Sequence, residues 1–209
     1  MLLICKFLNR CVEDLKLCPF YNRGKSPELC GFFWILRRFE DYAKSYTDAD
    51  RMLAEELIEM LRDGWLKGVE RGTRAPGGIT GTIFEEWLYK KLSEELKSTC
   101  ILRRGERIYL RLGDSEIKWV VDIHSECDRR VTAIEAKVYF DKQHSLMAKT
   151  LLDFTDIKWA FVSLHPLDKY VEGILQHVQS MYKGRFMYSS ILKDPHRAIK
   201  IIATFCKEG

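Results

Sequence analysis

Three charged side chains lie inside apolar segments of the chain, where burying an unpaired charge would be unfavourable. Asp122 follows an apolar run, and period-two alternation puts Glu135 and Lys137 on one face of a second run over residues 131–140. If the two segments pair, the carboxylates of Asp122 and Glu135 meet and repel each other. A divalent cation would hold both in the ionised form, and Lys137 beside it would offset developing charge or orient an attacking water. The pattern therefore predicts a metal site with an adjacent lysine.

Four alternating, β-branched segments are predicted to carry these residues as strands. We expect an antiparallel meander in which the hairpin between the last two strands brings Asp122 beside Glu135. The strands are expected at residues 100–104, 107–112, 117–123 and 131–140.

Helical periodicity indicates that helices surround these strands. A helix over residues 144–153 followed by an apolar strand at 159–164 predicts a crossover that yields a parallel partner strand. Residues 198–205 fit either a strand or a buried helix. Further helices are expected at residues 48–67, 82–97 and 166–182.

A glycine-rich stretch, residues 71–80, is the best domain boundary in the sequence. The length of 209 residues fits one domain with an appended piece. We therefore expect a mostly helical N-terminal extension over residues 1–75, with a part in DNA recognition or dimerisation, and an α/β core over 76–209. The core should hold a mixed central sheet flanked by helices.

The spacing resembles that of the PD-(D/E)XK nucleases, a superfamily with the restriction endonuclease-like fold. The resemblance rests on Asp122, a gap of twelve residues, and Glu135-Ala136-Lys137, preceded by a helix with Gly81-Thr82-Ile83-Phe84-Glu85. It covers residues 80–164. Val121 stands where the family motif has proline, a substitution that the family tolerates.

The resemblance implies a Mg²⁺-dependent DNA endonuclease in which Mn²⁺ can substitute. Its metal ligands map onto Asp122, Glu135 and the carbonyl of Ala136, with Glu85 as a further ligand and Lys137 as a catalytic residue. The compact size suggests a type II restriction endonuclease that acts as a homodimer on double-stranded DNA, without a nucleotide cofactor. The alternatives are a structure-selective repair or Holliday junction nuclease, and an inactive nucleic-acid-binding module on the same fold.

Several of these residues have simpler interpretations. Glu135 and Lys137 fit solvent-facing positions of an edge strand. Glu85 fits the third position of a capping box begun by Thr82, and Glu86 is the adjacent alternative ligand. A second metal site formed by His124, Glu126 and Asp128 is less favoured than a polar strand end and turn.

Lys and Arg contact phosphates, and fork-shaped or amide side chains read base edges. The net charge of +4 suits a polyanionic partner without requiring one. A helix start is as good an explanation of Lys142, Gln143 and His144 as a position near the scissile phosphate. The candidate DNA contacts are Arg71, Arg74, Arg103, Arg104, Arg107 and Gln143.

No run of 18 apolar residues occurs, so we expect a cytoplasmic protein without a membrane span. Seven cysteines without CxxC pairs signal neither a secreted disulfide scaffold nor a ribbon-type zinc site. The four cysteines within residues 5–30 allow a structural zinc, although buried thiols explain them more simply. Two Asn and three Gln hint at a thermophile, where intracellular disulfides occur.

Overall fold

The computed structural model describes residues 5–70, 76–112 and 114–208. The chain divides into two compact units, Met1–Ile83 (unit 1) and Phe84–Gly209 (unit 2). The division falls inside helix α5, Pro76–Leu96. The boundary expected after residue 75 lies earlier, beside the stretch 71–75 that is outside the described residues.

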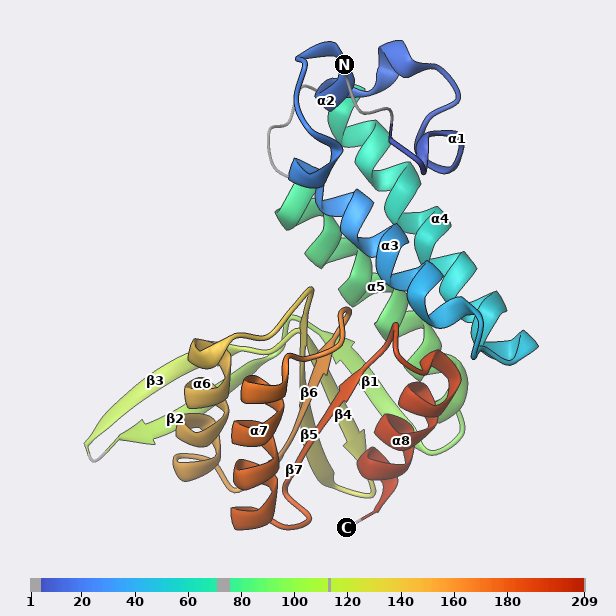
Figure 1. Cartoon of the computed structure of the whole chain (residues 1–209). Helices are drawn as coiled ribbons and strands as arrows, with labels where there is room; N and C mark the ends of the chain where they lie inside the picture. Colours follow the sequence, from blue (N-terminus) through green and yellow to red (C-terminus); the bar gives the residue numbers. More distant parts are fainter. Residues whose placement is uncertain (1–4, 71–75, 113, 209) are drawn as a thin grey trace. The chain divides into compact units, whose positions relative to one another are not determined.

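The described part of unit 1 is helical, as the sequence predicts (Figure 1). Two long helices carry its core, because aromatic and aliphatic residues recur along their buried faces. At Gly64 a side chain would meet Ile83, since a Cβ there would lie 1.9 Å from the Ile83 Cδ1. The elements of unit 1 before α5 are α1 (Leu8–Cys11), η1 (Leu15–Leu17), α2 (Pro19–Asn22), η2 (Pro27–Leu29), α3 (Gly31–Ala43) and α4 (Asp48–Glu70).

Unit 2 contains a five-stranded mixed sheet in the order β1-β4-β5-β6-β7. The pairs β1–β4 and β4–β5 are antiparallel, whereas β5–β6 and β6–β7 are parallel. The expected α/β class with a mixed central sheet is therefore confirmed. The strands are β1 (Cys100–Arg104), β4 (Ile123–Cys127), β5 (Arg130–Lys137), β6 (Lys158–Ser163) and β7 (Phe186–Ser190).

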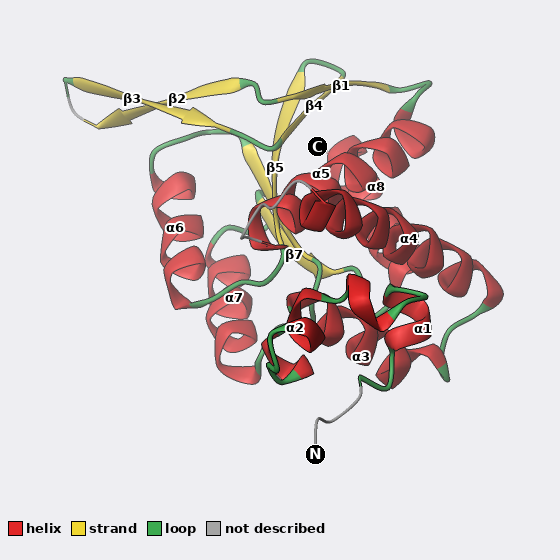
Figure 2. Ribbon diagram, turned by 90° about the horizontal axis from the view of Figure 1, so that it is seen from above, coloured by secondary structure: helices red, strands yellow, loops and turns green. Residues whose placement is uncertain are grey.

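A separate hairpin of β2 (Arg107–Leu112) and β3 (Ser115–Val120) replaces the expected meander. The predicted strand 117–123 is broken between Val120 and Ile123, so its two halves belong to different sheets. Strand β1 pairs with β4 across the insertion, not with β2. Figures 1 and 2 show the hairpin extending away from the edge of the large sheet.

Helices cover both faces of the sheet, with α6 and α7 on one side and α8 on the other (Figures 1 and 2). The C-terminal segment forms a helix with a buried face, which resolves the alternative left open by its sequence. None of the described helices combines the length and apolarity needed to cross a bilayer. The helices are α6 (Lys142–Asp153), α7 (Lys169–Met181) and α8 (Pro195–Lys207).

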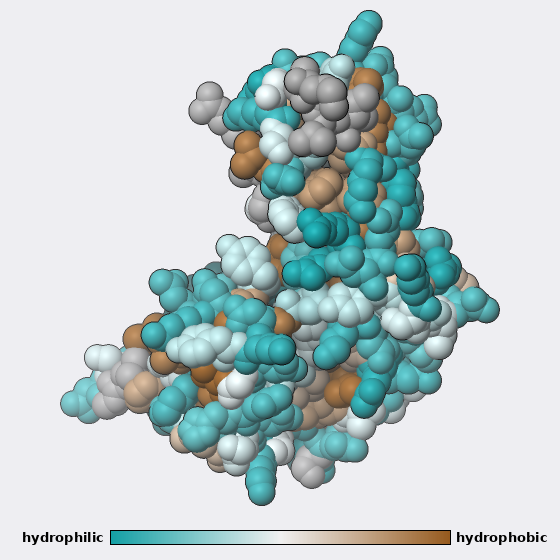
Figure 3. Space-filling view, in the orientation of Figure 1, coloured by the Kyte–Doolittle hydropathy of each residue, from teal (hydrophilic) through white to brown (hydrophobic). Residues whose placement is uncertain are grey.

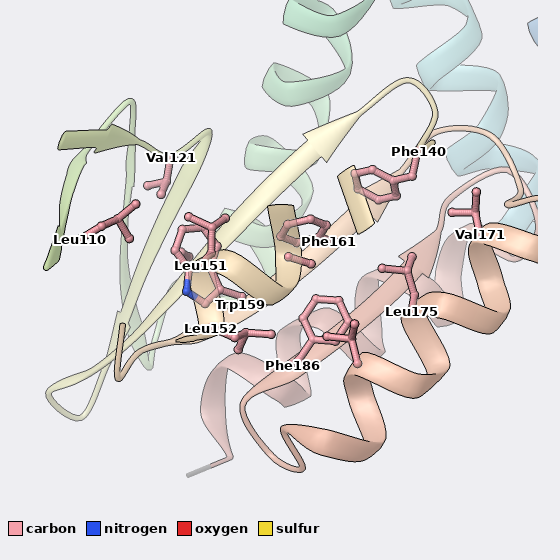
Figure 4. Close-up of a cluster of buried hydrophobic side chains, with 13 residues drawn as sticks. Leu110, Val121, Phe140, Leu151, Leu152, Trp159, Phe161, Val171, Leu175 and Phe186 are labelled. Atoms are coloured by element: carbon pink, nitrogen blue, oxygen red, sulfur yellow. The ribbon is translucent and has the colours of Figure 1, made fainter. Parts of the chain in front are cut away.

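The core of unit 2 on the α6 and α7 side combines aliphatic side chains with four aromatic ones (Figure 4). Phe161 stacks on Phe140, with ring centroids 5.3 Å apart, and meets Phe186 edge-on at 5.5 Å. The hairpin adds Leu110 to this cluster. A rigid core of this kind fixes β5 and β6, the strands that carry and support the charged residues.

A two-residue turn sets the register between β4 and β5. Asp128 and Arg129 adopt φ values of 49° and 66°, as a type I′ hairpin turn requires at both central positions. A disulfide between Cys100 and Cys127 ties β1 to β4 beside this turn. Because Ile123 pairs with Ile134, the next residues in the register, Asp122 and Glu135, come to lie opposite each other.

Candidate active site

Asp122 lies in the short break between β3 and β4, rather than inside a strand as the sequence suggests. Its Oδ2 accepts hydrogen bonds from the backbone N–H of Ala136, at 2.8 Å, and from Nζ of Lys137, at 2.7 Å. The break therefore directs the Asp122 carboxylate toward β5. There it lies beside Glu135 and Lys137, which the alternating sequence pattern predicts on one face of the strand.

Glu135 is the most deeply buried acid of the site, with 2% of its surface exposed. Its Oε2 lies 2.9 Å from Nζ of Lys137, and its Oε1 accepts a 2.9 Å hydrogen bond from Nε1 of Trp119. Strand β5 is the middle strand of its sheet. The interpretation of Glu135 and Lys137 as solvent-facing residues of an edge strand is therefore wrong.

The surrounding charges shift the proton affinities of Glu135 and Lys137. Burial raises the pKa of the Glu135 carboxyl and the charge of Asp122 raises it further, while Lys137 and the Trp119 indole offset part of the effect. Burial alone would lower the pKa of Lys137, but the two carboxylates outweigh it and raise that pKa above its ordinary value. Lys137 is therefore an ammonium at neutral pH.

Glu85 lies within the helix α5, and its interpretation as part of a capping box is wrong. The helix begins at Pro76, and the Thr82 hydroxyl donates to the carbonyl of Gly78 within the helix instead of capping it. Burial raises the pKa of Glu85 and the charge of Asp122 adds to the shift, which Lys137 and Arg104 partly oppose. Glu85 therefore lies within electrostatic range of Asp122, whereas the neighbouring Glu86 is exposed.

The residues present fit a Mg²⁺ ion in their chemistry. Among the described residues, no three His, Cys, Asp or Glu side chains converge to hold a metal. Mg²⁺ needs only one or two carboxylates, because water and substrate oxygens complete its shell. Asp122 and Glu135 supply two, and the N–H of Ala136 already faces Asp122, so the carbonyl of Ala136 faces the same side of β5. The Lys137 ammonium bridges the same two carboxylates, showing that they accept a shared cation.

The expected DNA contacts differ in what they touch. The guanidinium of Arg104 lies 5.9 Å from the ring centroid of Tyr89 and acts electrostatically on Glu85. Arg103 instead forms ion pairs with Glu126, at 3.6 Å, and Glu106, at 3.9 Å. Arg104 therefore lies near Glu85, whereas the side chain of Arg103 is already paired with acidic residues of unit 2.

The remaining candidates lie at other places. Arg107 is exposed on β2, and Gln143 is exposed in the first turn of α6. Arg71 and Arg74 lie outside the described residues. His144 caps α6 in a reciprocal capping box with Asp141, which accounts for it as part of a helix start.

The suggested second metal site is not formed by the described residues. Glu126 is paired with Arg103, and Asp128 forms the β4–β5 turn. This agrees with the simpler interpretation of these residues as a polar strand end and turn.

Sequence reasoning missed Trp119 and Tyr89. Trp119 comes from the inserted hairpin, and Tyr89 follows Glu85 by one helical turn on α5, where its hydroxyl donates to the carbonyl of Leu102 at 3.5 Å. The available signal in the sequence is a tryptophan in the apolar run three residues before Asp122, because an indole N–H removed from water needs an acceptor.

No family model matches the sequence, and no curated protein matches it. Among solved structures, the chain is similar to protein VC1899 from Vibrio cholerae, with 15% identity and a TM-score of 0.48 over 63% of this chain and 36% of that one. It is also similar to a protein of unknown function, AF1548, with 9% identity and a TM-score of 0.39 over 55% of this chain and 64% of that one. The chain thus spans less than two thirds of either structure, and neither assigns it an activity.

Proposed function

We propose that this chain is a metal-dependent DNA nuclease that hydrolyses phosphodiester bonds. The observation that carries the proposal is the hydrogen-bonded group of Asp122, Glu135 and Lys137, in which one ammonium bridges two carboxylates from adjacent segments. Burying like charges side by side is unfavourable unless they serve a purpose. Their arrangement also fits the motif of the PD-(D/E)XK nucleases, the family that we propose for this chain.

The chain's own residues divide the work of such a site. Asp122, Glu135 and the carbonyl of Ala136 would hold Mg²⁺, or Mn²⁺ in its place, and Glu85 would be an outer or second-metal ligand. When bound, the ion would supply Lewis-acid polarisation of a phosphate oxygen. The Trp119 indole holds Oε1 of Glu135, which leaves its other oxygen directed at Lys137.

Lys137 is suited to stabilise the transition state of phosphoryl transfer. Because it stays protonated, it acts as a hydrogen-bond donor and a positive charge, not as a general base. In the hydrolysis, a water oxygen would bond to phosphorus as the bond to the sugar oxygen in line with it breaks. The water would lose a proton to solvent and the sugar oxygen would gain one from solvent, while the negative charge on the phosphate oxygens grows near the ammonium. Loss of this donor should lower the cleavage rate by about 100-fold or more.

In its sharper form, the proposal is a type II restriction endonuclease that cuts a short duplex site as a homodimer. One carboxylate pair per chain supports a two-fold assembly, because cutting both strands then needs two copies. A repair or junction nuclease would read backbone shape instead. Exposed Arg107 and the site-adjacent Arg104 are available for phosphate contacts in either case.

A DNA digest with and without Mg²⁺ tests the activity. Discrete fragments from plasmid DNA would support restriction, whereas digestion of branched or single-stranded DNA alone would support the structure-selective nuclease. Asp122→Asn and Lys137→Ala should remove cleavage but keep DNA binding, and Lys169→Ala, an exposed lysine on α7, is the matched control. Binding without cleavage of any substrate would indicate the inactive binding module, and equal cleavage by all variants would overturn the proposed site.

A further inference from the structure

Four of the seven cysteines line a single small cavity in unit 1. Its volume is about 30 Å³, and Cys5, Cys11, Cys18 and Cys30 all contribute to its wall, together with Trp65. Cys5 precedes α1 and Cys11 ends it, while Cys18 and Cys30 stand directly before α2 and α3. The fold therefore assembles in one place the thiols that the sequence only shows as a loose cluster.

The four thiols are close enough to influence one another electrostatically. Burial raises the pKa of Cys11 to about 12, and the charges of Cys5, Cys30 and Cys18 raise it, while Arg10 opposes them. Cys18 and Cys5 act in the same way on Cys30. The four sulfurs therefore lie within electrostatic range of one another around a single cavity.

The segment around the cavity has little regular structure of its own. Its elements α1, η1, α2 and η2 are three or four residues long, and none of them contains a buried residue. Short irregular segments of this kind rarely bury enough apolar surface to fold without a cross-link or a metal. Phe7 and Val12 are buried in this segment, and the four cysteines line the cavity, Cys30 buried and the other three half-buried.

We propose that Cys5, Cys11, Cys18 and Cys30 bind a thiophilic metal centre as four thiolates. Four thiolate ligands are typical of structural zinc and of iron–sulfur clusters. A cavity of about 30 Å³ has room for a single ion such as Zn²⁺ once the sulfurs turn toward it. This centre is independent of the proposed nuclease site in unit 2.

The present side-chain positions correspond to the metal-free thiols. No three of the described Cys, His, Asp or Glu side chains converge on one point, so the sulfurs must turn toward a common centre when they bind. Lys25 lines the same cavity, and Lys6 and Arg10 act electrostatically on Cys5 and Cys11. These cations would balance the net negative charge of a metal with four thiolates.

Metal analysis of the full-length protein tests the proposal. The protein is purified without chelator in the absence of oxygen, and zinc, iron and acid-labile sulfide are measured per chain. About one zinc per chain would support a mononuclear site, and iron with sulfide would support a cluster on the same ligands. Protein without zinc or iron, which also fails to show thiolate-to-metal absorption when Co²⁺ is added, would overturn the proposal.

Cysteine variants locate the centre. Cys11→Ser and Cys30→Ser should lose the metal, whereas Cys206→Ser, which removes a buried free thiol of unit 2, should retain it. Metal retained in the Cys11 and Cys30 variants would place it elsewhere and overturn the assignment. If these variants are insoluble, the Co²⁺ spectrum of the wild-type protein decides, because four thiolate ligands give intense charge-transfer bands. Disulfides among the four cysteines of the anaerobic protein would also overturn it.

Discussion

The indole Nε1 of Trp119 donates a 2.9 Å hydrogen bond to Oε1 of Glu135. Trp119 belongs to β3 of the inserted hairpin and Glu135 to β5 of the central sheet, so one contact joins the two sheets at the most buried charge of the site. The hairpin also packs Leu110 into the core. The position of the hairpin and the orientation of the Glu135 carboxylate are therefore linked.

We expect Trp119→Phe to lower cleavage by roughly 10- to 100-fold, because it removes a hydrogen bond to a charged group and retains the aromatic packing. Glu135 would lose its orientation, so the Mg²⁺ concentration that gives half-maximal activity should rise. Titration of Mg²⁺ in a cleavage assay measures both effects.

Trp159→Phe is the control for Trp119→Phe. Trp159 is also a buried indole of unit 2, but its Nε1 donates to the hydroxyl of Thr155. This variant should lower stability without changing the Mg²⁺ requirement. Equal Mg²⁺ requirements in Trp119→Phe and the wild-type protein would show that the indole does not position Glu135.

Glu85 and Glu86 provide a matched pair of substitutions on α5. Glu85→Gln removes a charge that acts on Asp122, so cleavage should fall by about 10- to 100-fold, as is common for residues that support metal ligands. Glu86→Gln makes the same chemical change at the exposed neighbouring residue and should leave the cleavage rate unchanged. Glu86→Gln should melt at the wild-type temperature, whereas Glu85→Gln should melt at or slightly above it, because burial and the charge of Asp122 disfavour the ionised Glu85 carboxylate. Equal rates for the two would remove Glu85 from the site.

Much of the site could be predicted because it depends on local pattern. Period-two alternation in β5 and a short hairpin suffice to bring Glu135 and Lys137 near Asp122. The contribution of Trp119 could not be predicted in the same way. Its position depends on β2 and β3 forming their own sheet, and a break of two residues decides whether a strand continues or begins a new pairing.

The pairing of β1 with β4 shows a second limit of the sequence. Strands that follow each other in the chain usually pair, so the sequence predicts that β1 pairs with β2. It does not indicate that β2 and β3 are inserted between the actual partners, β1 and β4. Strand β7 was missed as a separate strand, because Phe186–Ser190 is short and its last three residues, Tyr188 to Ser190, are polar or only partly buried. The first error concerns a long-range contact and the second a strand with a weak local signal. The amphipathic helix α3 was not predicted as a separate element either, although its buried residues recur at helical spacing.

The exposed face of the β2–β3 hairpin should contact DNA phosphates. Arg107 is exposed on β2, and the hydrophobic side chains Tyr109, Ile117 and Val120 are exposed on the same hairpin. The surface drawn in Figure 3 is otherwise mostly hydrophilic, with hydrophobic residues in separate patches. Arg107→Gln should weaken binding to all sequences and reduce the slope of log affinity against log salt by about 1.

Lys200→Gln is the control for the Arg107 variant, because it removes an exposed positive charge from α8. It should leave the salt slope unchanged if binding is confined to the hairpin side. Fluorescence anisotropy at several salt concentrations measures both slopes. A slope unchanged in Arg107→Gln would exclude this residue from the DNA interface.

The Cys100–Cys127 disulfide should stabilise unit 2 by about 3 kcal/mol, because it closes a loop with a sequence separation of 27 and so restricts the unfolded chain. We expect reductant, or the Cys100→Ala/Cys127→Ala double variant, to lower the free energy of unfolding by this amount in denaturant titrations. Cys206→Ala, a buried free thiol in the same unit, controls for the loss of sulfur packing and should still respond to reductant. The double variant should not respond further. An unchanged denaturant midpoint of the wild-type protein in reductant would show that the two cysteines are thiols in the native protein. In that case the β4–β5 turn and strand pairing alone would set the register that brings Asp122 opposite Glu135.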